Sequence, residues 1–476
     1  AMPATSLYAN GGAEAISILV NGGLRIWDEK AFIRYLKGQS HQSRLTCVTR
    51  CGWFKPAVYV TPVRTFNPID KDMVVYQVNA RVKPEPSCGT LATWRDEVAA
   101  LCVGNSRLVL AVSTAFLSPM LTMLGVDGFC FHYVGASSSG KSRSMTVAAS
   151  VISDPKEYIR SWRATDNGLE GIAARHNDGL LCLDEIAQVD ASKAGEIAYM
   201  LPNGKGKQRS TKNGTAKEIQ QWCLALLSNG EIDLKSHADS VRKSTYAGQE
   251  MRVINIPADN CEFACFDTIH GEANGALFAD RLDKAVRENH GTAFNAWLDH
   301  LTINYDTIKE GWRDFKSAFL NSVAEDPSGQ IGRVAEKFAI AAYAGELSSE
   351  ITGWSPGTAT EAAKVCFTAW IERRGGTESH EDNEIVERIR QTIVRDGARF
   401  QDANKPDEIP TARVGFIKDD EYIIPVEGWK VIFAGLDARR AASVLQAKGI
   451  TKSDRRYLPG LGRVRCYIIH RDSLED

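Results

Sequence analysis

The sequence contains no apolar run long enough to suggest a membrane span. Its most apolar stretch, residues 108–124, is interrupted by serines, threonines and Pro119. A transmembrane helix needs about 20 consecutive, mostly apolar residues. We therefore expect a buried helix at 108–124 and no membrane among the partners.

A secretory signal, with a basic segment followed by an apolar one, is also lacking, so we expect a cytoplasmic protein. The start, Ala1-Met2, is typical of a residue added before a natural segment. We therefore expect natural sequence to extend further toward the N-terminus.

The eleven cysteines form no C-x-x-C pair. This spacing disfavours the commonest zinc and redox motifs and favours free thiols in a reducing compartment. One alternative stays open, because Cys47 and Cys51 together with Cys261 and Cys265 could supply four thiolates to a zinc ion.

The chain has little excess of either charge, with a net charge of −2. Any contact with nucleic acid must therefore use a local basic segment rather than a global field. The content of 43% hydrophobic and 24% charged residues is that of an ordinary globular protein, and 476 residues suffice for several domains.

One motif stands out within this ordinary composition. The segment Gly135-Ala-Ser-Ser-Ser-Gly140-Lys141-Ser142 matches G-x-x-x-x-G-K-[ST] at every fixed position. The apolar residues 129–134 before it predict a buried strand, and the residues after it can open a helix. Strand, glycine turn and helix are the context that a phosphate-binding loop requires.

The chemistry of this loop predicts ATP and Mg²⁺ as cofactors. Backbone N–H groups of the turn and the positive end of the following helix would hold phosphate oxygens. Lys141 would reach the β- and γ-phosphates, and the Ser142 hydroxyl would bind Mg²⁺. The predicted nucleotide-binding residues are Gly135, Ala136, Ser137, Ser138, Ser139, Gly140, Lys141, Ser142 and Arg143.

An acidic pair follows about 43 residues after Lys141. Residues 179–183 are apolar and predict a strand that ends at Asp184 and Glu185. Asp184 would hold Mg²⁺, as the second metal-site residue beside Ser142, and Glu185 would activate the attacking water. Asn229 ends the next predicted strand and could hold that water or sense the γ-phosphate; an Asn-Gly turn without a catalytic part is the alternative.

Two arginines are candidates for completing the ATP site. Arg252 stands directly before a last predicted strand at 253–257 and could act on a neighbouring subunit as an arginine finger. Arg242 is a weaker candidate for that role. Arg333 opens a predicted helix and could supply the lid arginine, against a simple solvated helix face.

Residues 205–217 hold five cations and no acid. Asn213-Gly214 is a strong hairpin signal, so the segment predicts a cationic β-hairpin inserted between two ATPase motifs. A solvated loop is the alternative, but the single sign of charge favours contact with nucleic-acid phosphates. The predicted DNA-binding residues are Lys205, Lys207, Arg209 and Lys212.

The fold class that we predict is α/β, with a P-loop ATPase core and three flanking parts. The expected domains are a small N-terminal α+β domain at 1–88, the core at 89–260, a helical lid region at 261–376 and a winged-helix-like C-terminal domain at 377–476. The last of these carries Lys452, Arg455, Arg456, Arg463 and Arg465, which favour either DNA or a protein as its partner.

Five segments together resemble a known family, namely 135–142, 158–165, 167–174, 176–186 and 247–253. They are similar to the helicase domain of bacterial phage, plasmid and cassette-type mobile elements, which is related to the MCM-like and superfamily 3 AAA+ ring helicases. The similarity extends from about residue 12 to the C-terminus. It is most specific at 129–260.

The resemblance implies a homo-oligomer, in the family a hexameric ring around DNA, with Arg252 completing the neighbour's site. It also implies that the hairpin at 205–217 points into the pore. Arg333 matches the family's lid arginine only loosely, so its placement in cis or trans stays open. A primase motif is not recognised in these residues, so priming would come either from sequence outside them or from another protein, and a primase or initiator is one candidate partner.

These observations predict an ATP-dependent DNA helicase or translocase of a mobile genetic element. One alternative is an AAA+ loader or remodeller that acts on protein, which would show no DNA-stimulated turnover. Another is a nucleotide-gated DNA-binding initiator, which would bind ATP without hydrolysing it. The basic hairpin argues against the first alternative and the acidic pair against the second.

Overall fold

The structure is a computed structural model that describes residues 4–39, 45–67, 73–77, 85–208, 219–233, 236–237, 251–323, 329–374, 380–395 and 397–474. The chain divides into two compact units, Ala1–Trp370 and Ile371–Asp476. The division lies close to the boundary expected at 377, whereas the boundaries expected at 89 and 261 fall inside the first unit.

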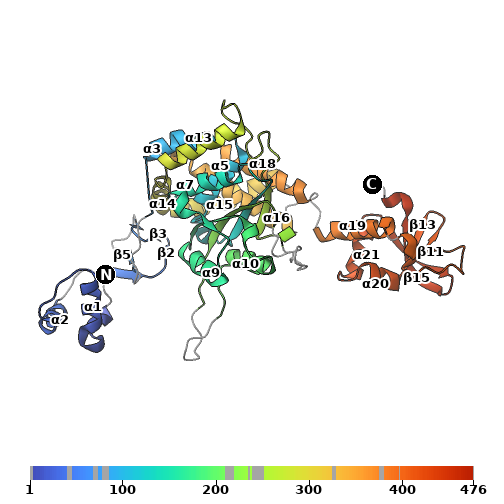
Figure 1. The fold of residues 1–476 in the computed structure, drawn as a ribbon, viewed down its shortest axis with the longest axis horizontal. Coiled ribbons are helices and arrows are strands. Elements are labelled where there is room, and N and C mark those ends of the chain that lie inside the picture. The colour runs from blue at the N-terminus through green and yellow to red at the C-terminus, as the bar shows by residue number, and fades with distance from the viewer. Residues whose placement is uncertain are drawn as a thin grey trace. The chain divides into compact units, whose positions relative to one another are not determined.

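The first unit is built on a parallel sheet with the strand order β10-β6-β9-β8-β7. Figure 1 shows strands as arrows in the middle of this unit, surrounded by helices. All four pairings between these strands are parallel. The strands are β6 (Phe129–Val134), β7 (Arg160–Ser161), β8 (Gly179–Asp184), β9 (Leu224–Gly230) and β10 (Val253–Pro257). The predicted strands at 129–134, 179–183 and 253–257 are therefore present, and the strand predicted before Asn229 is β9.

Helices cover both faces of this sheet, which explains why its strands are apolar on both sides. Leu181 and Leu226 belong to a core shared with Leu169 and Ile197. On the other face, Tyr133 donates to the backbone oxygen of Arg107. The covering helices are α9 (Asp166–Arg175) and α10 (Ala191–Asn203) on the first face and α5 (Ser106–Leu117) and α7 (Lys141–Ser150) on the second.

The apolar stretch 108–124 forms two helices rather than one. α5 ends at Leu117 and α6 (Met120–Leu124) begins after Pro119, whose ring removes a backbone donor. Every residue of α5 is buried, as expected. Among the described residues, no helix combines the length and the apolar character needed to cross a membrane.

The helix that opens the predicted core is capped by a pair of threonines. α3 (Leu91–Trp94) is capped by Thr90, whose side chain accepts from the Thr93 backbone, while the Thr93 side chain accepts from the Thr90 backbone. A reciprocal capping box satisfies two free N–H groups. Thr93 therefore serves as the third residue of the helix.

A helical region follows the sheet, as predicted, and packs directly on it. Phe338 of α16 lies 4.9 Å from Phe131 of β6 between ring centroids, and Trp297 donates to the Phe116 backbone oxygen. The helices are α13 (Gly275–Glu288), α14 (Ala293–Ile303), α15 (Tyr305–Val323), α16 (Gly329–Leu347), α17 (Ser349–Thr352) and α18 (Thr358–Arg374).

The N-terminal residues form two helices and two small sheets. Apolar side chains at Ala15, Ile16 and Ile33 pack the two helices together. The elements are α1 (Ala13–Asn21), α2 (Glu29–Gly38), the parallel pair β1 (Leu45–Val48) and β5 (Met73–Tyr76), and the antiparallel sheet of β2 (Gly52–Lys55), β3 (Val58–Val60) and β4 (Thr65–Phe66).

The three-stranded sheet is anchored to the core at Asp178, directly before β8. The Trp53 backbone donates to the Asp178 carboxylate at 3.1 Å, and Tyr59 donates to the Asp178 backbone oxygen at 2.7 Å. Burial raises the pKa of Asp178, although hydrogen bonds from Thr122 and Trp53 oppose the rise. This part of the predicted N-terminal domain is thus attached to the amino end of β8.

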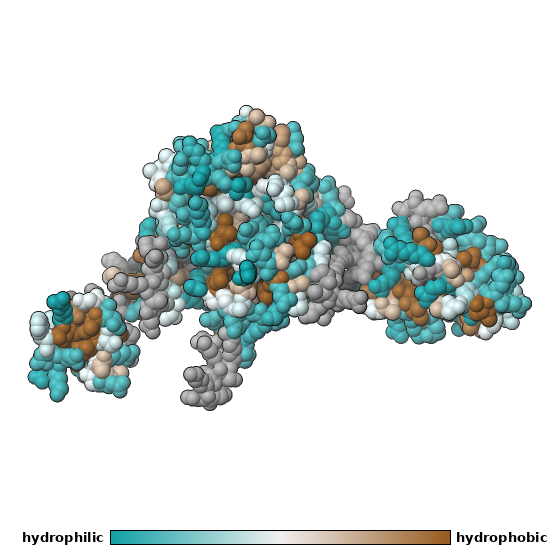
Figure 2. All heavy atoms as spheres, in the orientation of Figure 1, coloured by the Kyte–Doolittle hydropathy of each residue, from teal (hydrophilic) through white to brown (hydrophobic). Residues whose placement is uncertain are grey.

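The second unit combines three helices with a mixed sheet in the order β11-β12-β13-β15-β14. Trp429 and Tyr467 lie in its core, with ring centroids 4.2 Å apart. The elements are α19 (His380–Arg395), β11 (Phe400–Asp402), β12 (Gly415–Lys418), β13 (Glu421–Pro425), α20 (Val426–Ile432), α21 (Ala438–Ala447), β14 (Thr451–Leu458) and β15 (Gly462–His470). Figure 2 shows a largely hydrophilic surface with scattered apolar patches.

Candidate nucleotide site and basic hairpin

The predicted phosphate loop connects β6 to α7 and has the backbone that its glycines suggest. Gly140 has a φ of 97° and Ser138 a φ of 60°, both in the left-handed region. A Cβ atom at Gly140 would lie only 2.9 Å from Cζ of Phe266. Glycine is therefore required at 140 both by conformation and by the close packing of Phe266.

Lys141 opens α7 and its side chain is folded over the loop. Its Nζ donates to the backbone oxygens of Gly135 at 2.8 Å and Ala136 at 2.6 Å. The residue is only 8% exposed. These carbonyl partners keep a cation beside the positive end of α7, where an anionic ligand would be favoured.

Two residues near the end of the predicted core, one inside it and one beyond it, frame the loop. The Asp259 carboxylate accepts from the Ala136 backbone at 2.8 Å, and the Cys265 backbone donates to the Ser139 oxygen at 3.0 Å. Burial raises the pKa of the Cys265 thiol to about 11, so it is neutral at physiological pH. Cys265 therefore acts as a packing group of the loop.

The acidic pair lies where β8 ends, and both residues are half-buried. Glu185 has a φ of 60° and a ψ of 84°, an unusual conformation for a residue with a side chain. Its carboxylate accepts from the Ala187 backbone at 3.4 Å. Strained backbone of this kind concentrates at functional sites, where the surrounding structure holds it in place.

Asn229 connects the phosphate loop to the acidic pair. Its Oδ1 accepts from the Glu185 backbone at 2.9 Å, and its Nδ2 donates to the Ser142 hydroxyl at 3.4 Å. The side chain is 2% exposed. β9 lies between β6 and β8, so the tip of β9 necessarily separates the two predicted halves of the site.

Hydrogen bonds of the preceding residue, Ser228, hold the end of β9 in place beside Asn229. The neighbouring Ser228 hydroxyl accepts from the Trp162 indole at 2.8 Å and lies 3.0 Å from Nδ1 of His132. All three side chains are buried. Because β9 is fixed by these contacts, the Asn229 amide is held in one position.

Arg143 is directed away from the loop by an ion pair. Its guanidinium lies 2.8 Å from the carboxylate of Asp283 on α13. Its backbone N–H donates to the Gly140 oxygen at 2.9 Å. The side chain predicted among the nucleotide-binding residues thus ties α7 to α13 in this state.

Arg252 lies at the amino ends of the parallel strands, whereas the phosphate loop of the same subunit lies at their carboxyl ends. Val253 pairs with Cys130 near the start of β6, and Pro257 pairs with Val134 at its end. At about 3.3 Å per residue, Arg252 is roughly 20 Å from the start of the loop along the strand direction. Its guanidinium lies 4.8 Å from the ring centroid of Tyr199.

Arg333 is exposed on α16. It stands one helical turn before Lys337, whose ammonium lies 5.5 Å from the ring centroid of Phe129. Phe129 is the first residue of β6, and the phosphate loop follows the last. The helix is thus anchored beside the amino end of β6 near Arg333.

The two ends of the predicted basic hairpin run antiparallel at its base. Lys205 and Gln221 form a bridge, and Gly206 donates to the Gln220 oxygen at 2.9 Å. Lys205 is exposed. The predicted tip, including Arg209, Lys212 and the Asn213-Gly214 turn, lies outside the described residues, as does Arg242.

Lys207 differs from Lys205 because it is neutralised by carboxylates. Its Nζ lies 2.8 Å from Glu196 and 3.2 Å from Asp166. Hydrogen bonds to these two acids raise the pKa of Lys207. Lys207 therefore fastens the hairpin base to α9 and α10.

A cavity of about 510 Å³ opens beside this base. It lies at the start of α9 and the start of α10, beside residues 188–190, which follow β8. Two cations, Arg163 and Lys193, line it together with Asp166, which also contacts Lys207. The sequence analysis assigned no role to Arg163 or Lys193.

The alternative zinc site is not assembled among the described residues. The Cys51 backbone oxygen accepts from Asn177 at the amino end of β8, whereas Cys265 packs at the phosphate loop beside Ser144. No group of three or more potential ligands gathers in the described part of the chain.

Replacing Asn229 with alanine should lower ATP turnover by at least about tenfold, since a preorganised polar group of the site is lost. An unsatisfied Glu185 N–H would also cost about 1–3 kcal/mol of stability. Turnover and thermal unfolding should be measured together. Asn404→Ala, at an exposed asparagine of the second unit, is the control, and equal turnover in both variants would contradict the role of Asn229.

Comparison with protein families matches residues 1–221 to one described as a domain of unknown function, DUF927. This segment includes the phosphate loop and the acidic pair. No curated protein is found to be similar to the chain.

Solved structures give a likeness over almost the whole chain. One titled "SCCmec type IV Cch - active helicase" is 18% identical with a TM-score of 0.70, covering 97% of this chain and 87% of the other. At this identity the likeness shows a shared α/β fold. The structure titled "The A form apo structure of NrS-1 C terminal region-CTR" is 10% identical with a TM-score of 0.32, covering 92% and 89%.

Proposed function

We propose that the protein is a ring-forming AAA+ ATPase that translocates on DNA and separates its strands, in the replication of a mobile genetic element. The observation that carries the proposal is the contact of Asn229 with both Ser142 and Glu185. Two sequence motifs that are far apart in the chain meet through it. The fold shared with a solved helicase supports the same assignment.

In this mechanism the loop backbone and Lys141 bind the triphosphate of ATP. The β- and γ-phosphates would replace the carbonyl partners that Lys141 now has. Ser142 and Asp184 would hold Mg²⁺, a hard cation that prefers such oxygen ligands. Glu185 would accept a proton from the attacking water while Asn229 orients it.

DNA contact is assigned to the hairpin, as proposed from its charge. Lys205 is exposed at the base, and the cavity beside the base adds Arg163 and Lys193. The hairpin base and the cavity both lie on the side of the sheet that α9 and α10 cover. ATP-driven movement at the end of β8 could reach the hairpin through α10, since that helix leads from the acidic pair to Lys205.

Removing the hairpin charges tests this assignment. Lys205→Ala/Lys207→Ala/Lys212→Ala should keep basal ATP turnover but lose its stimulation by DNA, because phosphate contacts are lost while the nucleotide site is unchanged. ATPase activity with and without single-stranded DNA is the measurement.

Two controls separate charge from folding. Lys207→Ala alone should have the smaller effect on stimulation, since its ammonium is already paired with Glu196 and Asp166. A triple change of exposed lysines elsewhere in the unit, Lys156, Lys284 and Lys309, should leave stimulation intact. Full stimulation and unwinding by the hairpin variant would refute the DNA role of this segment.

An AAA+ machine that remodels protein is the second candidate. It is favoured only by the general ATPase site, which such machines would share. Basal turnover with no DNA effect, in the unchanged chain, would select it over the helicase.

A further inference from the structure

The long hairpin of the second unit sorts its cations onto two faces. β14 and β15 pair in an antiparallel register in which Arg455 faces Arg465 and Tyr457 faces Arg463. Residues directly opposite each other, and residues two apart on one strand, share a face. The first face, here called the arginine face, therefore carries Arg455, Tyr457, Arg463 and Arg465.

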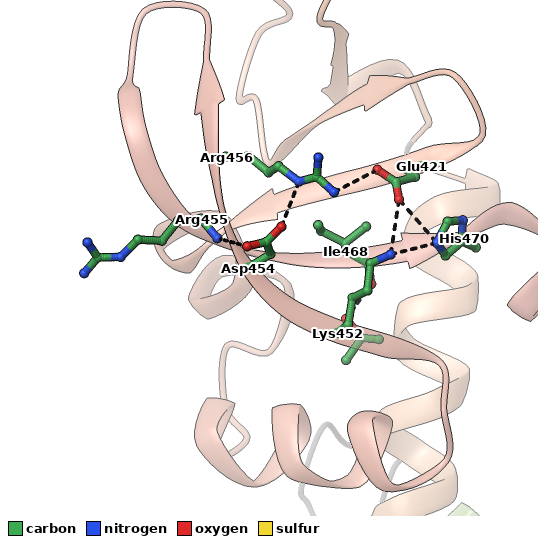
Figure 3. A network of polar contacts seen from close by, with 8 residues as sticks. Glu421, Lys452, Asp454, Arg455, Arg456, Ile468 and His470 are labelled. Carbon is green, nitrogen blue, oxygen red and sulfur yellow. Dashed lines mark hydrogen bonds and ion pairs between the residues drawn. The ribbon is translucent and has the colours of Figure 1, made fainter.

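On the other face of the hairpin, the cations are paired with carboxylates. Glu421 on β13 lies 3.5 Å from Lys452, 3.8 Å from Arg456 and 3.2 Å from His470. Arg456 also lies 3.1 Å from Asp454. Figure 3 shows this network gathered around Glu421.

On the arginine face the cations have no such partners. Figure 3 shows the guanidinium of Arg455 extending away from the network. Among the described residues, Arg455 and Arg463 form no ion pair, and Arg465 donates only to the Ser453 hydroxyl at 3.0 Å. All three arginines are exposed.

The register places like charges directly opposite each other. Arg455 and Arg465 form a cross-strand pair, an arrangement that is unfavourable without a counter-ion. A ligand with regularly spaced negative charges would remove this repulsion. Guanidinium groups bind phosphates through two parallel hydrogen bonds, which favours phosphates over other anions.

An exposed aromatic ring completes the surface. Tyr457 is 81% exposed and stands opposite Arg463 on the same face. The pairing of β13 with β15 ends at Cys466, so these residues project beyond the third strand of the sheet. Arginines beside a solvent-exposed ring are the combination that holds a nucleic-acid backbone and stacks on a base.

We propose that the arginine face of the β14–β15 hairpin is a second nucleic-acid site, which binds the phosphate backbone through Arg455, Arg463 and Arg465. It lies on a separate unit from the ATPase site and needs no ATP. An acidic protein is the competing ligand, and the test below distinguishes the two.

The test measures binding of labelled single-stranded and duplex oligonucleotides by the full-length chain without nucleotide. Arg455→Gln/Arg463→Gln should weaken binding about tenfold or more at moderate salt. The slope of log affinity against log salt should fall by about 1.4 to 1.8, the value for two phosphate contacts. The matched control is Lys452→Gln/Arg456→Gln, which removes two cations from the opposite face and should bind within about twofold of the unchanged chain.

Two further variants keep the outcome decisive. Arg455→Lys/Arg463→Lys keeps the charge and should retain most of the affinity, which excludes a folding defect. Tyr457→Ala should weaken single-stranded binding about fivefold or more and duplex binding less, because only free bases stack.

Unchanged oligonucleotide binding by the arginine-face variant would overturn the proposal, and so would equal losses from both faces. ATP turnover of the same variant should stay normal. If the unchanged chain showed no ATP turnover but its arginine face still bound DNA, the helicase assignment would be rejected and the proposal for the arginine face would stand.

Discussion

Lys141→Ala is expected to lower ATP turnover by at least about a hundredfold, in line with the loss of one preorganised donor from a reaction site. The buried ammonium now lies within hydrogen-bond distance of Gly135 and Ala136, where it is poised at the mouth of the loop. Alanine cannot reach a phosphate. Steady-state ATPase assays of the purified chain, with saturating DNA, measure the effect.

The same substitution also removes the contacts of Lys141 with the loop backbone. Thermal unfolding with and without ATP therefore accompanies the assay, since a bound ligand stabilises the folded state. Lys156→Ala, at an exposed lysine on α8 (Pro155–Tyr158), the short helix that follows α7, is the control for general effects. Turnover in Lys141→Ala within threefold of the control would remove the basis for an ATPase.

The core of the first unit was predictable because local signals agree with tertiary structure. Strands β6, β8 and β10 are continuous apolar runs, as strands buried on both faces require. α9 and α10 begin at side-chain caps, Thr165 and Asp190, that are visible in the sequence. Pattern and burial therefore gave the same answer at each of these elements.

The partners of the phosphate loop were not predictable in the same way. Phe266 and Cys265 lie beyond the expected end of the core at 260, yet they pack against Gly140 and Ser139. Asp283 on α13 takes the guanidinium of Arg143. Contacts between segments so far apart in the chain leave no periodicity in the sequence, so these partners of the loop could be found only in the structure.

Charge patterns in the sequence overestimated the number of available cations. Lys207 and Arg456 both belong to basic segments, yet each is paired with two carboxylates. Three of these four acidic partners come from other helices and strands, and only Asp454 lies on the same strand as the cation that it pairs with. The structure is needed to separate neutralised cations from Lys205 and Arg455, which stay available to a ligand.

The placement of Arg252 predicts rescue between two inactive variants. Arg252→Ala should lower turnover by about a thousandfold or more if the residue is an arginine finger. The guanidinium lies at the far edge of the sheet from its own loop, so it would serve a neighbouring subunit. Mixing Arg252→Ala with Lys141→Ala should then restore activity, since some sites would combine Lys141 of one subunit with Arg252 of the next.

Random assembly of an equal mixture would give an intact site at about one in four interfaces. We therefore expect roughly a quarter of the activity of the unchanged protein. The control mixes Lys141→Ala with Glu185→Gln, two residues that Asn229 joins within one subunit through Ser142 and the Glu185 backbone. Every subunit of that mixture lacks either Lys141 or Glu185. No subunit therefore holds both groups, and the control mixture should stay inactive. No activity in the first mixture would place Arg252 outside the shared site. Activity in the control would contradict the placement of Lys141 and Glu185 in one subunit's site.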